Sequence, residues 1–246
     1  MKTLLTIFTM LLISFSANAQ QNFYFGYENG GLFDRYHYVN SKGKSFVQSS
    51  IGGIYGINFG YRTGTYTIES GFYGLYSSMP IVEYDYNTSE VELSLSMSSG
   101  KENWLVPLRF GKEFLMMENR LFIKPEIGIN LIFARDYAEG KSNMGWATGI
   151  SFFPGDSIVP GPNSTRAYGY VPSKFNLGIE PSLTAGFRIW KGLDIYMKYS
   201  IIASLSPLYY ETITHISETE TVTATRSMLN SSTFQIGLKY HFKKIE

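Results

Sequence analysis

Residues 233–242 read Thr-Phe-Gln-Ile-Gly-Leu-Lys-Tyr-His-Phe, a stretch in which large apolar side chains alternate with polar or small ones. Every even-numbered position is apolar, whereas the odd-numbered positions include Gly237, Lys239 and His241. Successive side chains of a β-strand point to opposite faces. The alternation therefore predicts a strand whose two faces contact different media.

The same two-residue period returns in seven segments upstream. They cover residues 22–28, 47–62, 65–76, 104–114, 121–133, 175–189 and 193–201. Short connections such as 62–65, 115–120 and 191–192 suit hairpins, and long polar connections are expected at about 29–46, 78–101, 135–173 and 205–230. This rhythm predicts an all-β fold, an antiparallel eight-stranded transmembrane up-and-down β-barrel. As an alternative, residues 144–171 form an extra hairpin and the barrel has ten strands.

The composition bears on which face of each strand meets lipid. Charged residues make up 17% of the chain, against about 25% in an ordinary soluble domain. Glycine falls mostly on the polar side of the expected strands, as at Gly60, Gly128 and Gly237. An eight-stranded barrel leaves room only for closely packed side chains in its lumen. We therefore expect the apolar faces to contact lipid and the polar faces to line the lumen; the alternative is a secreted, soluble ligand-binding β-barrel or sandwich with its apolar face inside.

The first nineteen residues have the pattern of a secretory signal peptide. Lys2 precedes a mostly apolar run of about a dozen residues, and Ala17-Asn18-Ala19 supplies a small-x-small cleavage site. Such a run is too short for a membrane-spanning helix. We expect a signal peptide at residues 1–19 and one outer-membrane β-barrel domain at residues 20–246. Removal of Lys2 would leave 20 basic and 20 acidic residues, from the 21 and 20 of the full chain.

The barrel is expected to close, because the interior of a bilayer offers the backbone no hydrogen-bonding partner. In lipid every backbone N–H and C=O must find a partner within the protein, which an open sheet edge does not provide. The segments 23–28 and 233–242 are therefore expected to pair. Trp104, Trp190 and Phe242 stand near segment ends, where the aromatic girdles of membrane barrels lie.

Two stretches resemble a known family. The strand Trp104-Leu105-Val106-Pro107-Leu108-Arg109-Phe110-Gly111 and the closing Gly237-Leu238-Lys239-Tyr240-His241-Phe242 are similar to the outer-membrane β-barrel proteins of Bacteroidota-type bacteria, a porin-like grouping that includes PorT-like proteins and has an OmpX-like architecture. The resemblance implies a barrel in the outer membrane and supplies no catalytic residue. Such barrels often end on an aromatic residue, whereas Lys243-Lys244-Ile245-Glu246 follows Phe242 here.

The strand pattern places charged side chains inside the expected lumen. They are Glu69, Arg109, Glu113, Lys124, Glu126, Glu180, Arg188, Asp194, Lys198 and Lys239. Five are acidic and five basic, which favours cross-strand ion pairs, because an unpaired buried charge is costly. We expect an inert polar plug; the alternative is an ion path or a proton-responsive plug.

Signatures of chemistry are sparse. The absence of Cys excludes disulfides, thiol nucleophiles and Cys-ligated metals, and the balanced charge argues against nucleic acid as a partner. Asp34 and His37 with Ser41 or Ser45 form the one set considered for an outer-membrane lipid hydrolase or acyltransferase. Asp34, Asp85, Asp136 and Asp156 match no EF-hand pattern. We therefore predict a non-enzyme with no catalytic, cofactor-binding or metal-binding residues and no cofactor.

A specific function is expected in the extracellular loops, since binding residues concentrate on loops carried by a rigid scaffold. The stretches that combine aromatic and polar residues are 34–38, 83–87 and 135–173, the last with Trp146, Phe152, Phe153, Tyr168 and Tyr170. They are interpreted either as recognition surfaces or as extensions of the strands. We predict a monomer in contact with outer-membrane lipid that has a structural, adhesion or docking role toward a protein or glycan partner. The alternative is a small-solute or ion porin.

Overall fold

The computed structural model describes residues 23–85, 90–134, 144–147, 164–190, 192–216 and 221–242. Their strands are β1 (Phe23–Asn40), β2 (Ser45–Thr63), β3 (Tyr66–Asp85), β4 (Glu90–Lys112), β5 (Phe114–Met116), β6 (Leu121–Ala134), β7 (Met144–Ala147), β8 (Ser164–Tyr170), β9 (Phe175–Trp190), β10 (Leu193–Ser204), β11 (Tyr209–Ile216) and β12 (Thr221–His241). Within these residues no helix has the length and apolar character needed to cross a membrane. The expected signal peptide at residues 1–19 lies outside the described residues.

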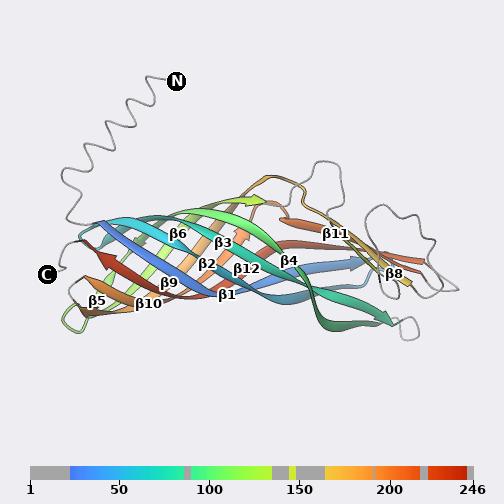
Figure 1. The fold of residues 1–246 in the computed structure, drawn as a ribbon, viewed down its shortest axis with the longest axis horizontal. Helices are drawn as coiled ribbons and strands as arrows, with labels where there is room; N and C mark the ends of the chain where they lie inside the picture. The colour runs from blue at the N-terminus through green and yellow to red at the C-terminus, as the bar shows by residue number, and fades with distance from the viewer. Residues whose placement is uncertain are drawn as a thin grey trace, which may run out of the picture.

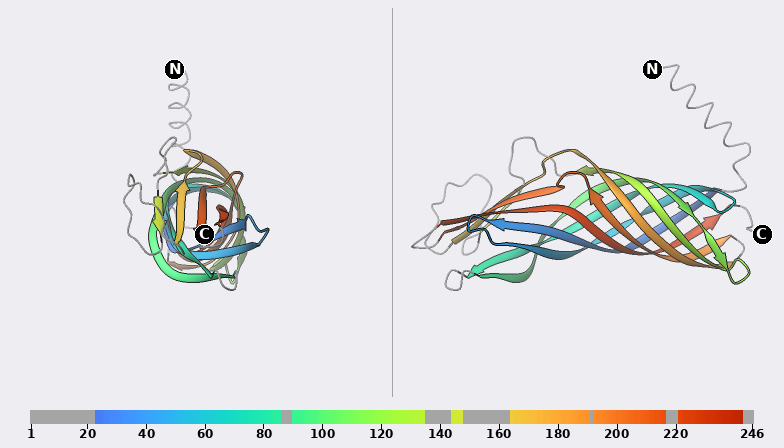
Figure 2. Two further views of the ribbon diagram at one scale, coloured as in Figure 1. Left: turned by 90° about the vertical axis from the view of Figure 1, so that its right-hand side faces the viewer. Right: turned by 180° about the vertical axis from the view of Figure 1, so that it is seen from behind.

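Eight of these strands form a closed antiparallel barrel (Figures 1 and 2). The order around the ring is β1-β2-β3-β4-β6-β9-β10-β12, and β12 pairs with β1 from Tyr24↔His241 to Asn40↔Ala224. β5 continues the line of β4 and pairs with β6. The ring has no free edge in the membrane, so its backbone groups satisfy one another as a bilayer requires. The predicted eight-stranded barrel and its closure are confirmed.

Three tight turns lie together at one end of the barrel. Left-handed backbone conformations occur at Gly64 (φ 60°), at Gly192 (φ 93°) and at the three residues 117–119, which are the turns expected from the sequence. The amide of Phe242 donates a hydrogen bond to the carbonyl of Phe23 at 3.0 Å, so the first and last described residues meet at this same end. Short turns face the periplasm in bacterial outer-membrane barrels, and the opposite end is therefore extracellular.

Three of the four long polar loops expected at the extracellular end, 29–46, 78–101 and 205–230, are mostly strand instead, and the described parts of 135–173 include β7 and β8. β1 runs to Asn40 and β2 begins at Ser45, so residues 41–44 alone connect them. The side-chain oxygen of Asn40 accepts hydrogen bonds from the amides of Lys42 and Lys44, and Gly43 has a φ of 79°. β3 and β4 likewise continue through most of 78–101. The loop prediction was wrong because the alternation persists in these stretches with polar residues on both faces, which hides the period from a count of apolar residues.

These extensions build a second structure above the ring, here called the extracellular sheet. It contains residues 45–52 of β2, 33–40 of β1, 221–230 of β12, and the strands β11, β8 and β7, paired in that order. Figures 1 and 2 show β8 and β11 at the end far from the termini. The hairpin considered within residues 144–171 does form, as β7 and β8, but it extends this sheet through β11. The ten-stranded alternative was therefore wrong.

The two faces of the ring strands have opposite environments, as predicted. On β12, Ile236 and Leu238 are 54% and 49% exposed, whereas Lys239 is 1% exposed. Trp190 and Phe242 are among the most exposed aromatic side chains near the periplasmic end, and Trp104 stacks on Phe72 at a centroid distance of 4.9 Å. With apolar side chains outside, the soluble alternative was wrong.

Candidate functional site

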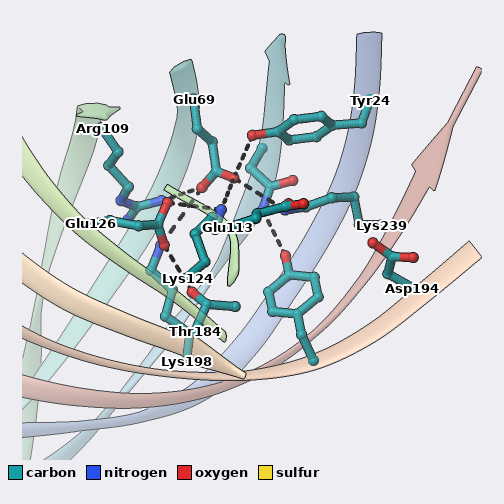
Figure 3. Close-up of polar contacts among 12 residues, drawn as sticks. Tyr24, Glu69, Arg109, Glu113, Lys124, Glu126, Thr184, Asp194, Lys198 and Lys239 are labelled. Carbon is teal, nitrogen blue, oxygen red and sulfur yellow. Dashed lines mark hydrogen bonds and ion pairs between the residues drawn. The ribbon is translucent and has the colours of Figure 1, made fainter. Parts of the chain in front are cut away.

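A charged cluster fills the membrane half of the lumen, with Glu69 at its centre (Figure 3). The Tyr24 hydroxyl donates a hydrogen bond to Glu69 at 3.0 Å. Four cationic groups lie near the same carboxylate: Arg109 at 3.1 Å, Lys124 at 3.4 Å, Lys239 at 3.5 Å and Lys198 at 3.7 Å. They come from β4, β6, β12 and β10. The cluster therefore ties together strands on all sides of the ring.

Arg109 makes the most directional contacts of the cluster. Its Nε and Nη2 atoms donate to the two oxygens of Glu180 at 3.1 and 3.0 Å, and Nη1 donates to Glu69 and to the Tyr73 hydroxyl. A planar guanidinium suits such bidentate pairing. Lys124 in turn lies 2.8 Å from Glu126, which accepts a hydrogen bond from Thr184. All ten charged residues predicted to face the lumen do so and take part in ion pairs with one another.

The sequence interpretation missed a further buried carboxylate, Glu28, and the uncharged groups that bind it. Glu28 accepts hydrogen bonds from Tyr73, Tyr196 and Asn58 at 2.7–2.8 Å and from Gln235 at 3.2 Å. A tyrosine between two lipid-facing residues points inward, because its position in the strand decides its face. Its ring, however, reads as one more apolar residue in a row and obscures the alternation. Position in the period, rather than polarity, was the signal that could have identified them.

Inward glycines accommodate these aromatic rings. A Cβ atom on Gly237 would lie 2.3 Å from Cζ of Tyr196, and one on Gly60 would lie 2.3 Å from the Tyr24 hydroxyl. No real Cβ atom tolerates such an approach, so each ring occupies space that a side chain on the facing strand would need. A narrow and fully packed lumen therefore explains, as predicted, why glycine occupies these positions on the polar side of the strands.

A second group of charges closes the periplasmic end. Glu113 binds Arg62 at 3.3 Å and Arg188 at 3.0 Å. His241 Nε2 lies 2.9 Å from Asp194, which also lies 3.7 Å from Arg188. Arg62 was not among the predicted lumen residues; it stands at the strand end, where its side chain turns in toward Glu113.

Above the charged cluster, a belt of large apolar side chains shares the lumen with buried polar ones such as Asp34, Ser77 and Asn176, so the polar plug expected from the sequence is only part of the filling. Seven ring strands contribute to this apolar belt, together with a residue that precedes β9 and residues at the start of β11. The buried side chains are Leu32, Tyr36, Ile54, Tyr73, Leu75, Leu105, Ile132, Val171, Ile202, Leu208, Tyr209 and Met228. The polar-face interpretation failed because residues such as Leu105 stand between two lipid-facing neighbours and look like part of a continuous apolar run.

The inner face of the extracellular sheet has a small core of its own. Tyr38, Ile213 and Ala224 are buried together, with Phe46 packed against them. His215 Nε2 lies 3.4 Å from the Tyr38 hydroxyl, and burial lowers the pKa of His215 to about 4. His215 is therefore neutral at physiological pH. Arg226 pairs with Glu211 and donates to Gln48 at 3.1 Å.

The set considered for hydrolase chemistry does not assemble. Asp34 is buried inside, where it accepts a hydrogen bond from Ser231 at 2.6 Å. His37 has the opposite parity on β1 and points outward, and its Nε2 lies 2.9 Å from Oγ of Ser45. Ser41 is an exposed turn residue. The His–Ser contact therefore lacks the carboxylate that would orient the imidazole.

Within the described residues no group of three or more His, Cys, Asp or Glu is arranged to hold a metal ion. Of the four aspartates considered for calcium, Asp34 is an inward residue of β1 and Asp85 ends β3. Asp136 and Asp156 lie outside the described residues.

The outward face of the extracellular sheet is the other surface of interest. Of the recognition stretches expected from the sequence, Tyr168 and Tyr170 lie on β8 with 52% and 44% exposure. Trp146 belongs to β7, residues 83–85 belong to β3, and residues 34–38 alternate between the two faces of β1. Tyr86, Asn87, Phe152 and Phe153 lie outside the described residues. The interpretation as strand extension is confirmed for the parts that the structure describes.

Comparison with known proteins yields only distant structural similarity. No protein-family model matches the chain, and a search of curated proteins gives no match. Similar solved structures include Neisserial surface protein A (NspA), with 12% identity over 89% of this chain and 96% of that chain and a TM-score of 0.37. The attachment invasion locus protein Ail of Yersinia pestis has 8% identity over 87% and 99%, with a TM-score of 0.33. A major outer membrane protein from Thermus thermophilus has 7% identity over 87% and 98%, with a TM-score of 0.41.

At these identities and TM-scores nothing about function passes from those proteins to this chain, and its own geometry defines its class. The eight-stranded ring is closed, apolar side chains cover its outside, and ion pairs fill its membrane half. Only a closed barrel satisfies its backbone in lipid while presenting strands. The chain is an integral β-barrel protein of the outer membrane.

Proposed function

We propose that this protein is a surface docking or adhesion protein, in which a plugged barrel anchors an extracellular binding sheet. The observation that carries the proposal is the continuation of β1, β2 and β12 beyond the apolar band, where they pair with β11, β8 and β7. Beyond Phe234 on β12, the outward residues Asn230, Ser227, Thr225, Thr223 and Thr221 are polar. The additional sheet lies outside the apolar band and does not help to anchor the protein in the membrane, so a binding role explains it better.

The filled lumen supports a role other than transport. Charged side chains in the membrane half pair with one another, and large apolar side chains from seven strands fill much of the lumen above them. We therefore propose a non-enzymatic, monomeric protein that contacts outer-membrane lipid through its outer apolar band and a protein or glycan through its sheet. The balanced charge supports the exclusion of nucleic acid.

We also propose a signal peptide, a single barrel domain and a family relationship for this chain. The pattern of residues 1–19 supports a signal peptide, followed by one barrel domain at residues 20–246. The motifs at 104–111 and 237–242 support a relationship to the Bacteroidota-type, PorT-like barrels.

The test compares attachment with conductance. The mature protein is reconstituted into liposomes, which are applied to surfaces coated with extracellular glycans or proteins, and into planar bilayers. We expect saturable attachment of the liposomes and no stepwise ion conductance. Protein-free liposomes are the control. Reproducible conductance steps without attachment would instead establish the porin alternative.

A further inference from the structure

Lys112 is an exposed, outward cation at the periplasmic end of the barrel. It is the last residue of β4, and its neighbour across the β3–β4 ladder is Tyr66, the first residue of β3. The tight turn at Gly64 comes directly before this pair. Figure 1 shows β5, which continues the line of β4, at the end of the barrel where β12 finishes. Lys112 therefore lies where the apolar band of the outer wall meets the headgroup layer of the leaflet that faces the periplasm.

Two aromatic rings hold the Lys112 ammonium group. Its Nζ atom lies 5.5 Å from the ring centroid of Tyr66 and 5.3 Å from that of Phe114. A third ring, that of Phe110, stacks on Tyr66 at a centroid distance of 5.8 Å and an interplanar angle of 18°. All three rings are exposed on the outer wall. Because the negative face of an aromatic ring attracts a cation, the rings keep the charge beside the wall.

Lys112 has no counter-ion in the part of the chain that the structure describes. Arg62 and Arg188, at the same end, both pair with Glu113 inside the barrel. Among the described residues, no carboxylate or other hydrogen-bond acceptor lies within bonding distance of the Lys112 Nζ atom. An ammonium group has three N–H donors, and the two rings exclude part of the water that would accept from them. A charge left without a partner beside an apolar surface is costly, so the site favours an external anion.

The membrane supplies an anion at this level, the phosphate group of a phospholipid. Phosphate oxygens accept short, charge-assisted hydrogen bonds from an ammonium group, and a lysine near an anionic membrane surface gains about 1 kcal/mol from it. Farther into the apolar band, Ile68 and Phe110 pair across the β3–β4 ladder and are both exposed. The wall thus presents a cation, then aromatic rings, then apolar side chains. A phospholipid presents its phosphate, glycerol backbone and acyl chains in the same order.

We propose that Lys112, Tyr66 and Phe114 bind the headgroup phosphate of one anionic phospholipid from the leaflet that faces the periplasm. The Lys112 ammonium donates to the phosphate oxygens, and the two rings hold the ammonium at the level of the headgroups. A zwitterionic headgroup fits less well, because its own ammonium competes with Lys112 for the phosphate and for the ring faces. The site goes beyond the proposed docking function, since it lies at the opposite end of the barrel from the extracellular sheet.

The experiment measures the lipid bound to the mature full chain in detergent micelles by native mass spectrometry. Phosphatidylglycerol is compared with phosphatidylethanolamine and diacylglycerol of the same acyl chains, and with glycerol phosphate as a free phosphate ester. Lys112→Gln removes the charge, Lys112→Arg keeps it, and Tyr66→Leu with Phe114→Leu removes the rings but keeps an apolar wall. Arg120→Gln is the matched control, because Arg120 is an exposed cation in the turn between β5 and β6. Heat-modifiable gel mobility verifies that each variant retains the barrel.

We expect phosphatidylglycerol to bind more tightly than phosphatidylethanolamine, and its affinity to fall at least about tenfold in Lys112→Gln, a loss of about 1.4 kcal/mol. The double leucine variant should also bind more weakly, whereas Lys112→Arg and Arg120→Gln should retain the affinity of the wild type.

Equal binding by Lys112→Gln, or an equal loss in Arg120→Gln, overturns the inference. Diacylglycerol that binds as tightly as phosphatidylglycerol also overturns it, because acyl contacts would then suffice. Binding of glycerol phosphate without the lipid would assign the site to a free phosphate ester and refute the lipid. An unchanged affinity in the double leucine variant would refute the role of the rings. Attachment of liposomes through the extracellular sheet does not involve Lys112, so this inference and the docking function fail separately.

Discussion

The interior of this protein is built in two ways on either side of the apolar belt. In the membrane half, Glu69 alone lies within 3.7 Å of four cationic groups from four strands. In the extracellular sheet, Arg226 pairs with Glu211, while His215 lies beside Tyr38 in a largely apolar core. The closed ring surrounds each charge with strands on every side and can compensate it. The extracellular sheet has edges, and its interior combines a small apolar core with a single Arg226–Glu211 ion pair and the buried His215.

Arg109→Ala tests the requirement for charge compensation most severely. The substitution leaves Glu180 and Glu69 without their guanidinium partner in a buried site, and removal of one partner of a buried ion pair costs about 3–5 kcal/mol. We expect the free energy of unfolding in liposomes, measured by urea titration with gel mobility, to fall by that amount. Arg35→Ala, an exposed position on β1, is the control and should change it by less than about 0.5 kcal/mol. Equal stability of the two variants would contradict the comparison.

Lys239→Ala separates stability from permeability. Lys239 lies 3.5 Å from Glu69 and 4.3 Å from the ring centroid of Tyr24, but Glu69 keeps three other cations. We expect a smaller loss of about 1.5–3 kcal/mol, the usual range for a bond to a charged group. Planar-bilayer conductance should stay at the baseline of the wild type, because the apolar belt is intact. A new steady conductance would mean that the charges, and not the belt, close the lumen.

Gly237→Ala tests the packing of rings against glycines. The new methyl group would meet the ring of Tyr196, and overpacking of this kind costs about 1–3 kcal/mol. The matched control is Gly53→Ala, because a Cβ atom there meets nothing closer than 3.9 Å. We expect a lower midpoint of thermal gel-mobility conversion for Gly237→Ala only. A similar shift for both variants would show that strand propensity, rather than the ring, decides the effect.

The smallest effect concerns pH and is confined to the extracellular sheet. Burial lowers the pKa of His215 to about 4 from its ordinary value of 6.5, so between these values the unfolded segment binds a proton that the folded one does not. Stability of β11 and β12 should therefore decrease as the pH falls from about 6.5 to about 4 and change no further on this account below that. Amide hydrogen exchange of β11 across this range is the measurement. His215→Gln should flatten the profile, while His37→Gln at an exposed position should leave it; an unchanged profile in His215→Gln would refute the assignment.

Sequence reasoning succeeded where each strand separates lipid from the lumen. In that region the period alone placed Glu69, Arg109 and Lys239 inside, and the turns at Gly64 and Gly192 followed from their short polar connections. The register between neighbouring strands then brings the inward charged side chains within ion-pairing distance of one another. The same reasoning missed Tyr196 and Leu105, because an apolar inward residue between lipid-facing neighbours does not break the pattern.

Beyond the membrane, the two-residue period no longer distinguishes the two faces of a strand. Water is available to the outer face there, so polar residues suit both sides. Residues 33–40 and 221–230 were therefore expected as loops, although they continue β1 and β12. The pairing of β11 with β8 joins residues that are 40 to 52 positions apart in the chain, from Tyr210↔Tyr170 to Ile216↔Ser164, and no local pattern encodes it. Tyr168 and Tyr170 stood in a stretch noted for its aromatic residues, but only the ladder showed that Tyr170 shares a surface with Tyr210.

The apolar belt has an electrical consequence. Between the two charged regions of one lumen, large apolar side chains from seven strands fill much of the space. We propose that the molecule acts as an insulator inserted through the membrane, so that its copy number can rise without adding a leak of small ions.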